Sequence, residues 1–175
     1  MQANKDALHL VEVTPLFQQQ VMAFRDSFGP GPIHGGFGLK EANPFKDWYH
    51  FVQQCKTKDT VPKGMVPASS YLLLNHREMV GIVNLRHRLN EGLLYDGGHI
   101  GYSIRPSYRG RGYGKKILSL CLDQARAIGL TSVLLTVKTD NMASIRVVKA
   151  NGGRLENQVK ARSGQLVNRY WIDLS

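Results

Sequence analysis

The chain has 175 residues, enough for one globular domain, and its 42% hydrophobic content excludes an intrinsically disordered protein. No apolar run approaches the roughly 18 residues that span a bilayer, and two cysteines are too few for a disulfide scaffold. We therefore expect a single domain over residues 1–175, without a membrane segment and located in the cytoplasm. The net charge of +10 favours a polyanionic partner: nucleic acid, an acidic membrane surface or a phosphate-rich small molecule.

The first half of the chain predicts a strand, two helices and a hairpin. After a strand at 8–13, Thr14-Pro15 is typical of a capped helix start, and apolar residues follow at helical spacing. A loop rich in glycine and proline, from Gly29 to Pro44, precedes a second helix at 45–56. Two strands, at 70–74 and 79–85, then flank a polar turn.

The second half alternates strands and helices. The expected strands are 99–104, 133–137, 154–160 and 165–174, and the expected helices are 112–128 and 141–150. This order predicts an α/β (α+β) fold with a mixed central sheet of about seven strands flanked by helices.

The segment 105–116 carries the strongest chemical signal. It lies between a predicted strand and a predicted helix, and it holds Gly110, Gly112 and Gly114, five basic residues and no acidic one. Glycines let backbone N–H groups approach a ligand, and a helix N-terminus adds partial positive charge, so the segment predicts an anion site suited to a pyrophosphate. The spacing matches neither a nucleotide P-loop nor the Gly-x-Gly-x-x-Gly fingerprint of dinucleotide-binding domains.

The segment resembles the acyl-coenzyme A loop of the GNAT superfamily of N-acetyltransferases. That family's pattern, Arg/Gln-x-x-Gly-x-Gly/Ala, is matched by Arg109, Gly112 and Gly114. The segments 102–106, 134–137, 141–144 and 149–153 follow in the family's order, so the resemblance covers roughly residues 70–174. It implies the GNAT fold, with a splayed pair of strands at an acetyl-CoA site.

The resemblance also implies roles for particular residues. Backbone groups of Tyr102 and Ile104 would pair with the pantetheine arm, and the loop amides would hold the pyrophosphate. Asn141 and Ser144 would contact the coenzyme from the other side, although Asn141 is equally a natural helix N-cap. The residues expected to bind acetyl-CoA are therefore Tyr102, Ile104, Arg109, Gly110, Arg111, Gly112, Tyr113, Gly114, Lys115, Asn141 and Ser144.

The implied reaction is direct attack of a primary amine on the acetyl thioester, without a covalent enzyme intermediate. Many relatives carry a tyrosine acid seven residues after the Asn141 position, where this chain has Val148. We therefore expect Asp96 and His99, near the fourth strand, as candidate bases, with Glu91 as a more distant choice. Tyr170 is the expected substitute acid; Tyr108, Tyr113 and departure of the thiolate without an acid stay open as alternatives. The histidines lack metal-ligand spacing, so no metal is expected.

Two other functions stay open. One is an acyl-CoA-binding regulatory domain without catalysis, which the missing tyrosine allows. The other is a basic nucleic-acid-binding module, which is less favoured because the charge clusters on one glycine loop. For the enzyme, the partners are acetyl-CoA and an amine on a small molecule or a protein, and a homodimer is left open. The amine would lie between the N-terminal helices and the last strands, with the 29–44 loop as a wall or lid.

Overall fold

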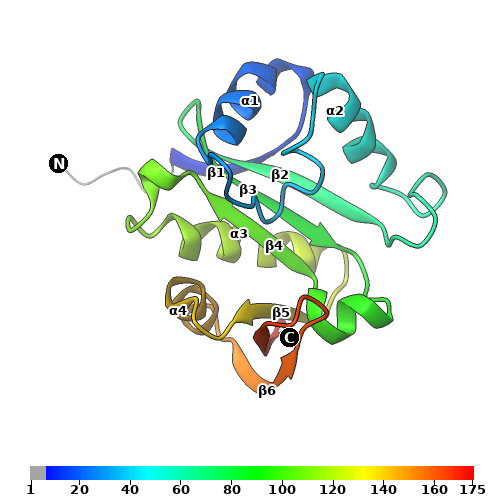
Figure 1. The fold of residues 1–175 in the computed structure, drawn as a ribbon, viewed down its shortest axis with the longest axis vertical. Helices are drawn as coiled ribbons and strands as arrows, with labels where there is room; N and C mark the ends of the chain where they lie inside the picture. Colours follow the sequence, from blue (N-terminus) through cyan, green and yellow to red (C-terminus); the bar gives the residue numbers. More distant parts are fainter. Residues whose placement is uncertain (1–6) are drawn as a thin grey trace.

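The computed structural model describes residues 7–175, and all seven expected strands are present (Figure 1). They form two antiparallel sheets. The first has the order β1-β2-β3-β4, with bounds Leu8–Glu12, Ala68–Asn75, Glu78–Arg86 and Ile100–Ile104. The second has the order β5-β7-β6, with bounds Ser132–Lys138, Leu166–Asp173 and Arg154–Lys160.

Four helices surround the sheets. Their bounds are α1 Gln18–Asp26, α2 Phe45–Gln54, α3 Tyr113–Ala127 and α4 Met142–Ala150. Short turns of helix precede α1 (η2, Pro15–Phe17) and follow β4 (η4, Pro106–Tyr108). Helices α1 and α2 cover one face of the four-stranded sheet, α3 covers the other, and α4 lies beside the three-stranded sheet (Figure 1).

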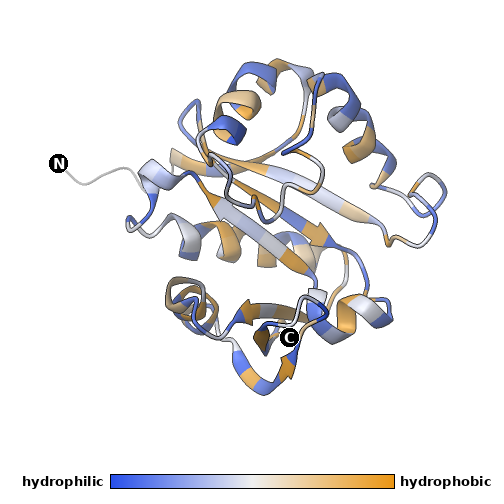
Figure 2. Cartoon of the chain, viewed as in Figure 1, coloured by the Kyte–Doolittle hydropathy of each residue, from blue (hydrophilic) through white to orange (hydrophobic). Residues whose placement is uncertain are grey.

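The four-stranded sheet separates two hydrophobic cores because successive strand residues face opposite sides. Leu72 of β2 packs in the core beneath α1 and α2, which also contains Phe24 and Trp48. Its neighbour Leu73 packs in the core that contains Leu118 of α3. Figure 2 shows apolar residues on the strands between the helical layers.

Strands β4 and β5 meet at one point and then join separate sheets. The His99 N–H donates to the Leu134 carbonyl at 2.7 Å, and the Leu134 N–H donates to His99 Nδ1 at 2.9 Å. Beyond this contact β4 pairs only with β3, and β5 only with β7. The expected splayed pair is therefore held together at the start of β4, and one edge of β4 is left without a strand partner.

Two local features differ from the sequence analysis. The predicted cap is wrong: the chain enters α1 through the turn η2, and the Thr14 hydroxyl is buried without a hydrogen-bond partner among the described residues. In addition, a π-helical turn, η3 (Leu93–Gly97), forms between β3 and β4, where no element was predicted. The Asn90 side chain accepts from the Leu93 N–H at 2.9 Å and starts this turn.

Candidate active site

The expected acetyl-CoA residues gather around one cavity of about 650 Å³, which we call the glycine-loop cavity. Its walls come from β4, the segment after it, the first turns of α3 and α4, and the loop after α1. Ten of the expected residues line it, namely Tyr102, Ile104, Arg109, Gly110, Gly112, Tyr113, Gly114, Lys115, Asn141 and Ser144. Arg111 does not: its guanidinium lies over the Tyr108 ring, 4.9 Å from the ring centre.

The glycine loop presents free backbone amides to this cavity. Gly110 and Gly112 have φ angles of 76° and 83°, a left-handed conformation that strains any other residue. Helix α3 starts directly after Gly112, and its first backbone hydrogen bond runs from the Lys116 N–H to the Gly112 carbonyl at 3.2 Å. The amides of the first turn therefore lack helical partners, and no acidic side chain lies there to satisfy them. This arrangement suits an anionic ligand.

The β2–β3 hairpin turn fixes the loop from outside. The Tyr108 hydroxyl donates to Glu78 Oε2 at 2.6 Å, and Arg105 forms a longer ion pair, 3.6 Å, with the same carboxylate. Glu78 therefore neutralises charge at the rim of the loop. Arg109 and Lys115, by contrast, form no ion pair within residues 7–175 and keep their positive charge available to the cavity.

The free edge of β4 faces the gap toward β5. The Arg105 N–H donates to the Val80 carbonyl, and the Arg86 N–H to the His99 carbonyl, both at 2.8 Å. Because antiparallel pairing alternates, the odd-numbered residues of β4 direct their backbone groups toward β3. The N–H and C=O groups of Tyr102 and the N–H of Ile104 consequently point the other way, where an extended amide-containing chain could pair with them. The Ile104 carbonyl on this edge accepts from Arg109 Nε at 3.3 Å.

Helix α4 closes the opposite wall. Asn141 Oδ1 accepts from the Ser144 N–H at 3.2 Å, so Asn141 is the N-cap of α4. The Tyr102 hydroxyl donates to Ser144 Oγ at 3.3 Å and ties α4 to β4. A Cβ added at Gly114 would lie 3.2 Å from Val147 Cγ2, so this glycine allows α3 and α4 to approach closely. The coenzyme roles of Asn141 and Ser144 stay predictions.

The structure does not bring the three expected catalytic residues to this cavity. His99 is 5% exposed, and its Nδ1 is occupied by the Leu134 N–H. Burial, with a smaller effect from the charge of Arg86, lowers the pKa of His99 to about 4. Tyr170 is buried, and its hydroxyl accepts from Asn168 Nδ2 at 3.2 Å. The His99 side chain therefore joins β4 to β5, whereas Tyr170 packs in the core beside α3 and forms its hydrogen bond within β7.

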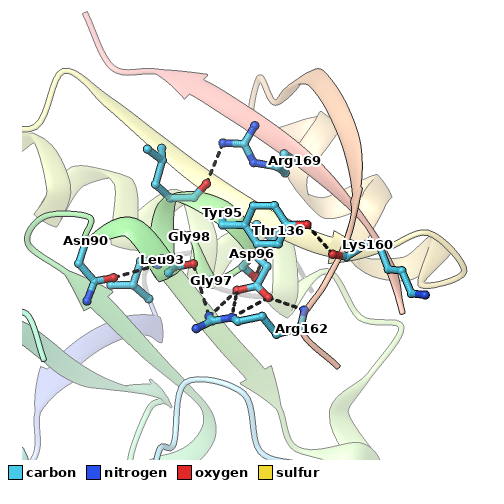
Figure 3. A network of polar contacts seen from close by, with 12 residues as sticks. Asn90, Leu93, Tyr95, Asp96, Gly97, Gly98, Thr136, Lys160, Arg162 and Arg169 are labelled. Atoms are coloured by element: carbon cyan, nitrogen blue, oxygen red, sulfur yellow. Dashed lines mark hydrogen bonds and ion pairs between the residues drawn. The ribbon is translucent and has the colours of Figure 1, made fainter. Parts of the chain in front are cut away.

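Asp96 likewise holds the fold together, at the end of η3. Its carboxylate accepts from the Arg162 backbone N–H at 2.8 Å and from Arg162 Nε at 3.0 Å (Figure 3). These hydrogen bonds lower the pKa of Asp96. The Asp96 carbonyl accepts from the Thr136 hydroxyl at 2.9 Å, which joins η3 to β5. Arg162, in the β6–β7 turn, is thus the fixed partner of this carboxylate.

His34 was not singled out from the sequence as a site residue, yet it lines the glycine-loop cavity. The Ser103 hydroxyl donates to its carbonyl at 2.8 Å, and a Cβ on Gly35 would lie 2.4 Å from the Gly101 carbonyl oxygen, so this loop packs directly on β4. Partial burial and the charge of Lys138 lower the pKa of the His34 imidazole. The Gly/Pro-rich composition of the 29–44 loop was its only signal.

A second cavity, of about 610 Å³, shares no lining residue with the first. We call it the α2 cavity because Phe51 and Val52 of that helix form part of its wall. Cys55, residues 64–66, strands β2 and β3, residues 90–93 and Arg162 also line it, and part of this wall is drawn in Figure 3. The 29–44 loop contributes to both cavities, because His34 lines the first and Phe37 the second.

Within residues 7–175, no three His, Cys, Asp or Glu side chains gather as a metal site. No helix there has the length and apolar character to cross a membrane.

Comparison with known proteins defines the class. Residues 12–154 match the family described as an acetyltransferase (GNAT) domain. The chain therefore belongs to the GNAT acetyltransferase family and is an acyltransferase enzyme. It is 32% identical over 85 residues to the L-methionine sulfoximine/L-methionine sulfone acetyltransferase of Salmonella typhimurium. That alignment spans 49% of this chain and 48% of the relative, about half of each.

Solved structures share the whole fold. YncA from Salmonella typhimurium, determined with its cofactor acetyl-CoA, is 17% identical with a TM-score of 0.61, over 97% of this chain and 95% of that one. The ribosomal-protein-S5-alanine acetyltransferase of Vibrio fischeri is 13% identical with a TM-score of 0.69, over 99% and 96%. At these identities the likeness establishes the GNAT fold.

Proposed function

We propose that this enzyme binds acetyl-CoA in the glycine-loop cavity and transfers the acetyl group to a primary amine that enters from the α2 cavity. One observation carries the proposal. The same cavity combines unpaired amides at the start of α3, the uncompensated charges of Arg109 and Lys115, and the free edge of β4. These three features match the pyrophosphate and the amide-rich pantetheine arm of one molecule.

The size of the cavity supports acetyl-CoA as the co-substrate. A volume of about 650 Å³ lies within the usual range of small-molecule sites. The amides of Tyr113 and Gly114 would hold the pyrophosphate, and the backbone of Tyr102 and Ile104 would orient the thioester arm. Arg109 and Lys115 from the loop side and Arg146 from α4 all line the cavity, so three basic side chains are available to the phosphates.

Acetyl-CoA supplies an activated acyl carbon, and the enzyme's residues bring an amine to it. As the amine nitrogen attacks, a C–N bond forms, the C–S bond breaks with its electron pair leaving on sulfur as the coenzyme A thiolate, and the nitrogen loses a proton. His34 is the proposed acceptor of that proton. Among residues 7–175 no carboxylate lines the glycine-loop cavity, and the lowered pKa of His34 keeps its imidazole neutral and able to accept a proton near neutral pH.

The relatives act on amines of different sizes. One is named for small amino-acid derivatives and another for the alanine of a ribosomal protein. We therefore propose a primary amine as the class of acceptor, on either a small molecule or a protein.

The test is release of coenzyme A from acetyl-CoA in the presence of a panel of primary amines. We expect release that depends on both the amine and the protein, with the acetylated amine identified by mass spectrometry. Acetyl-CoA binding without turnover across the panel would instead support the non-catalytic binding domain.

A further inference from the structure

Arg86, at the end of β3, lies in the wall of the α2 cavity with no counter-ion. Its Nη1 donates to the Gly97 carbonyl at 3.2 Å and to the Gly98 carbonyl at 3.0 Å. No residue of 7–175 accepts from its Nε or Nη2, and no carboxylate there forms an ion pair with it. Burial lowers the pKa of this guanidinium. A largely buried cation is costly unless a ligand supplies negative charge.

The other two charged side chains that line the α2 cavity, Arg162 and Glu91, form no ion pair with Arg86. Arg162 is held by Asp96 and also donates to the Gly92 carbonyl, so its charge is balanced (Figure 3). Glu91 lines the cavity as a carboxylate but pairs with neither arginine. The cavity therefore contains one unpaired cation, Arg86, and one unpaired anion, Glu91.

The free edge of Arg86 has a particular shape. With Nη1 engaged by the two carbonyls, the Nε and Nη2 groups remain, and this edge matches the two oxygens of a carboxylate. The remaining wall is mainly apolar, with Phe37, Phe51 and Met65 among its residues. Phe37 is 71% exposed, so its ring is accessible on this wall.

The position of Arg86 relative to the proposed thioester site is also suitable. The Arg86 N–H donates to the His99 carbonyl, so Arg86 lies level with the start of β4, where β4 and β5 separate. Tyr102 pairs with Val83, three residues back along β3, so at a strand rise of ~3.3 Å per residue the Cα levels of Arg86 and Tyr102 differ by about 10 Å. The amino acid would therefore lie beside the first residues of β4, with the thioester arm reaching toward it from Tyr102.

We propose that the acceptor is an apolar α-amino acid, whose carboxylate binds the Nε–Nη2 edge of Arg86. Its side chain would lie on the apolar wall that includes Phe37, and its amino group would point toward β4. This inference rests on the proposed function, because it names the substrate class of the same reaction.

The first experiment compares acceptors on the wild-type protein. L-Leucine is paired with 3-methylbutylamine, which lacks only the carboxylate, and with L-leucinamide, which lacks its charge. L-Phenylalanine and 2-phenylethylamine form a second pair. We expect kcat/KM to be at least ~30-fold higher for each amino acid, in line with the effect of losing one partner of a buried charge pair.

Variants then assign the preference to one residue. Arg86→Gln should lower kcat/KM for L-leucine at least ~30-fold and change that for 3-methylbutylamine less than ~3-fold. Arg86→Lys keeps the charge but loses the two-pronged guanidinium edge, so its kcat/KM for L-leucine should lie between that of the wild type and that of Arg86→Gln. Arg88→Gln is the matched control, because Arg88 is exposed and its substitution removes the same charge. This variant should leave kcat/KM for both acceptors unchanged. Unchanged affinity for acetyl-CoA would show that each variant is folded.

The outcomes separate this inference from the proposed function. Failure of the wild-type protein to bind acetyl-CoA overturns both. Acetyl-CoA binding with equal kcat/KM for amines with and without a carboxylate, or for the N-terminal amine of an amidated peptide, overturns only the amino-acid assignment. If no acceptor turns over, L-leucine is titrated calorimetrically into the protein–coenzyme A complex. Binding that Arg86→Gln abolishes would support the assignment, and absence of binding would overturn it.

Discussion

The two cavities of this enzyme are of similar volume but are assembled in different ways. The glycine-loop cavity takes most of its polar groups from 15 consecutive positions, 102 to 116, and its ligand-facing atoms are largely backbone. The α2 cavity takes its wall from six separate parts of the chain, and its specific groups are side chains such as Arg86. The first is therefore fixed by local conformation, and the second by tertiary packing.

This difference separates two parts of the activity. Backbone amides at a helix N-terminus bind phosphate whatever the neighbouring side chains are, so the coenzyme end can stay the same among relatives. Side chains on separate segments can change independently, so the α2 cavity is where the acceptor would be selected. Each of the following predictions disturbs one side of this contrast.

The largest expected effect is at Gly112. Gly112→Asp puts a carboxylate beside the phosphate site and strains a φ of 83°. We expect affinity for acetyl-CoA to fall by at least ~100-fold, measured by calorimetry. Gly112→Asn, similar in shape but neutral, should lose less. Gly152→Asp, at φ 88° with equally open surroundings, is the control for backbone strain and should keep full affinity. Equal losses at 112 and 152 would contradict a phosphate site at the loop.

The next largest effect is expected at His34, in the 29–44 loop that lines both cavities. His34→Ala should lower kcat by about 100-fold or more, because it removes the proposed base, while the affinity for acetyl-CoA changes little. Since burial and Lys138 lower the pKa of His34, the wild-type rate should fall on acidification only below pH 6.5, where the imidazole becomes protonated. The variant should lose that limb of the pH–rate profile. An unchanged kcat would remove His34 as the base.

His99 tests the junction of β4 with β5. Its pKa of about 4 lies below the unfolded value of 6.5, so the unfolded chain binds the extra proton. Stability should be unaffected above pH 6.5 and should decrease as the pH falls from 6.5 toward 4, by up to roughly 3 kcal/mol. His99→Asn keeps an acceptor for the Leu134 N–H without titrating. Denaturant unfolding at several pH values should show a smaller acid loss in this variant, and an identical loss would contradict the assignment.

The smallest effect distinguishes two neighbouring arginines. Arg109 lines the glycine-loop cavity, whereas Arg111 lies over the Tyr108 ring. Arg109→Gln should weaken acetyl-CoA binding by about 10-fold, and Arg111→Gln by less than ~3-fold, because only the first charge faces the phosphates. The two variants change the net charge equally. A larger loss at Arg111 would mean that this side chain turns into the cavity when the coenzyme binds.

Sequence reasoning predicted the elements well, and most of the residues that it assigned to the coenzyme line one cavity, for a physical reason. The strand–loop–helix segment 102–116 is local, and positive φ angles require Gly110 and Gly112 there. Helical and strand periodicity likewise gave the seven strands and four main helices. Both signals come from residues that are near one another along the chain.

The acceptor end could not be read in the same way. Asp96 and His99 were chosen because they are titratable and precede β4, but their hydrogen bonds join η3, β4 and β5. His34 and Arg86 lie 52 positions apart in the sequence and have no motif that links them. Which of these side chains faces a cavity depends on how the 29–44 loop packs on β4, and only the folded structure shows it.

The most direct test of the central claim is calorimetric titration of the wild-type protein with acetyl-CoA, with ADP and NADH as controls. We expect saturable binding of acetyl-CoA and much weaker binding of the two nucleotides, because neither has a pantetheine arm to pair with the free edge of β4. Absence of acetyl-CoA binding to the folded protein, or equal affinity for all three, would contradict it.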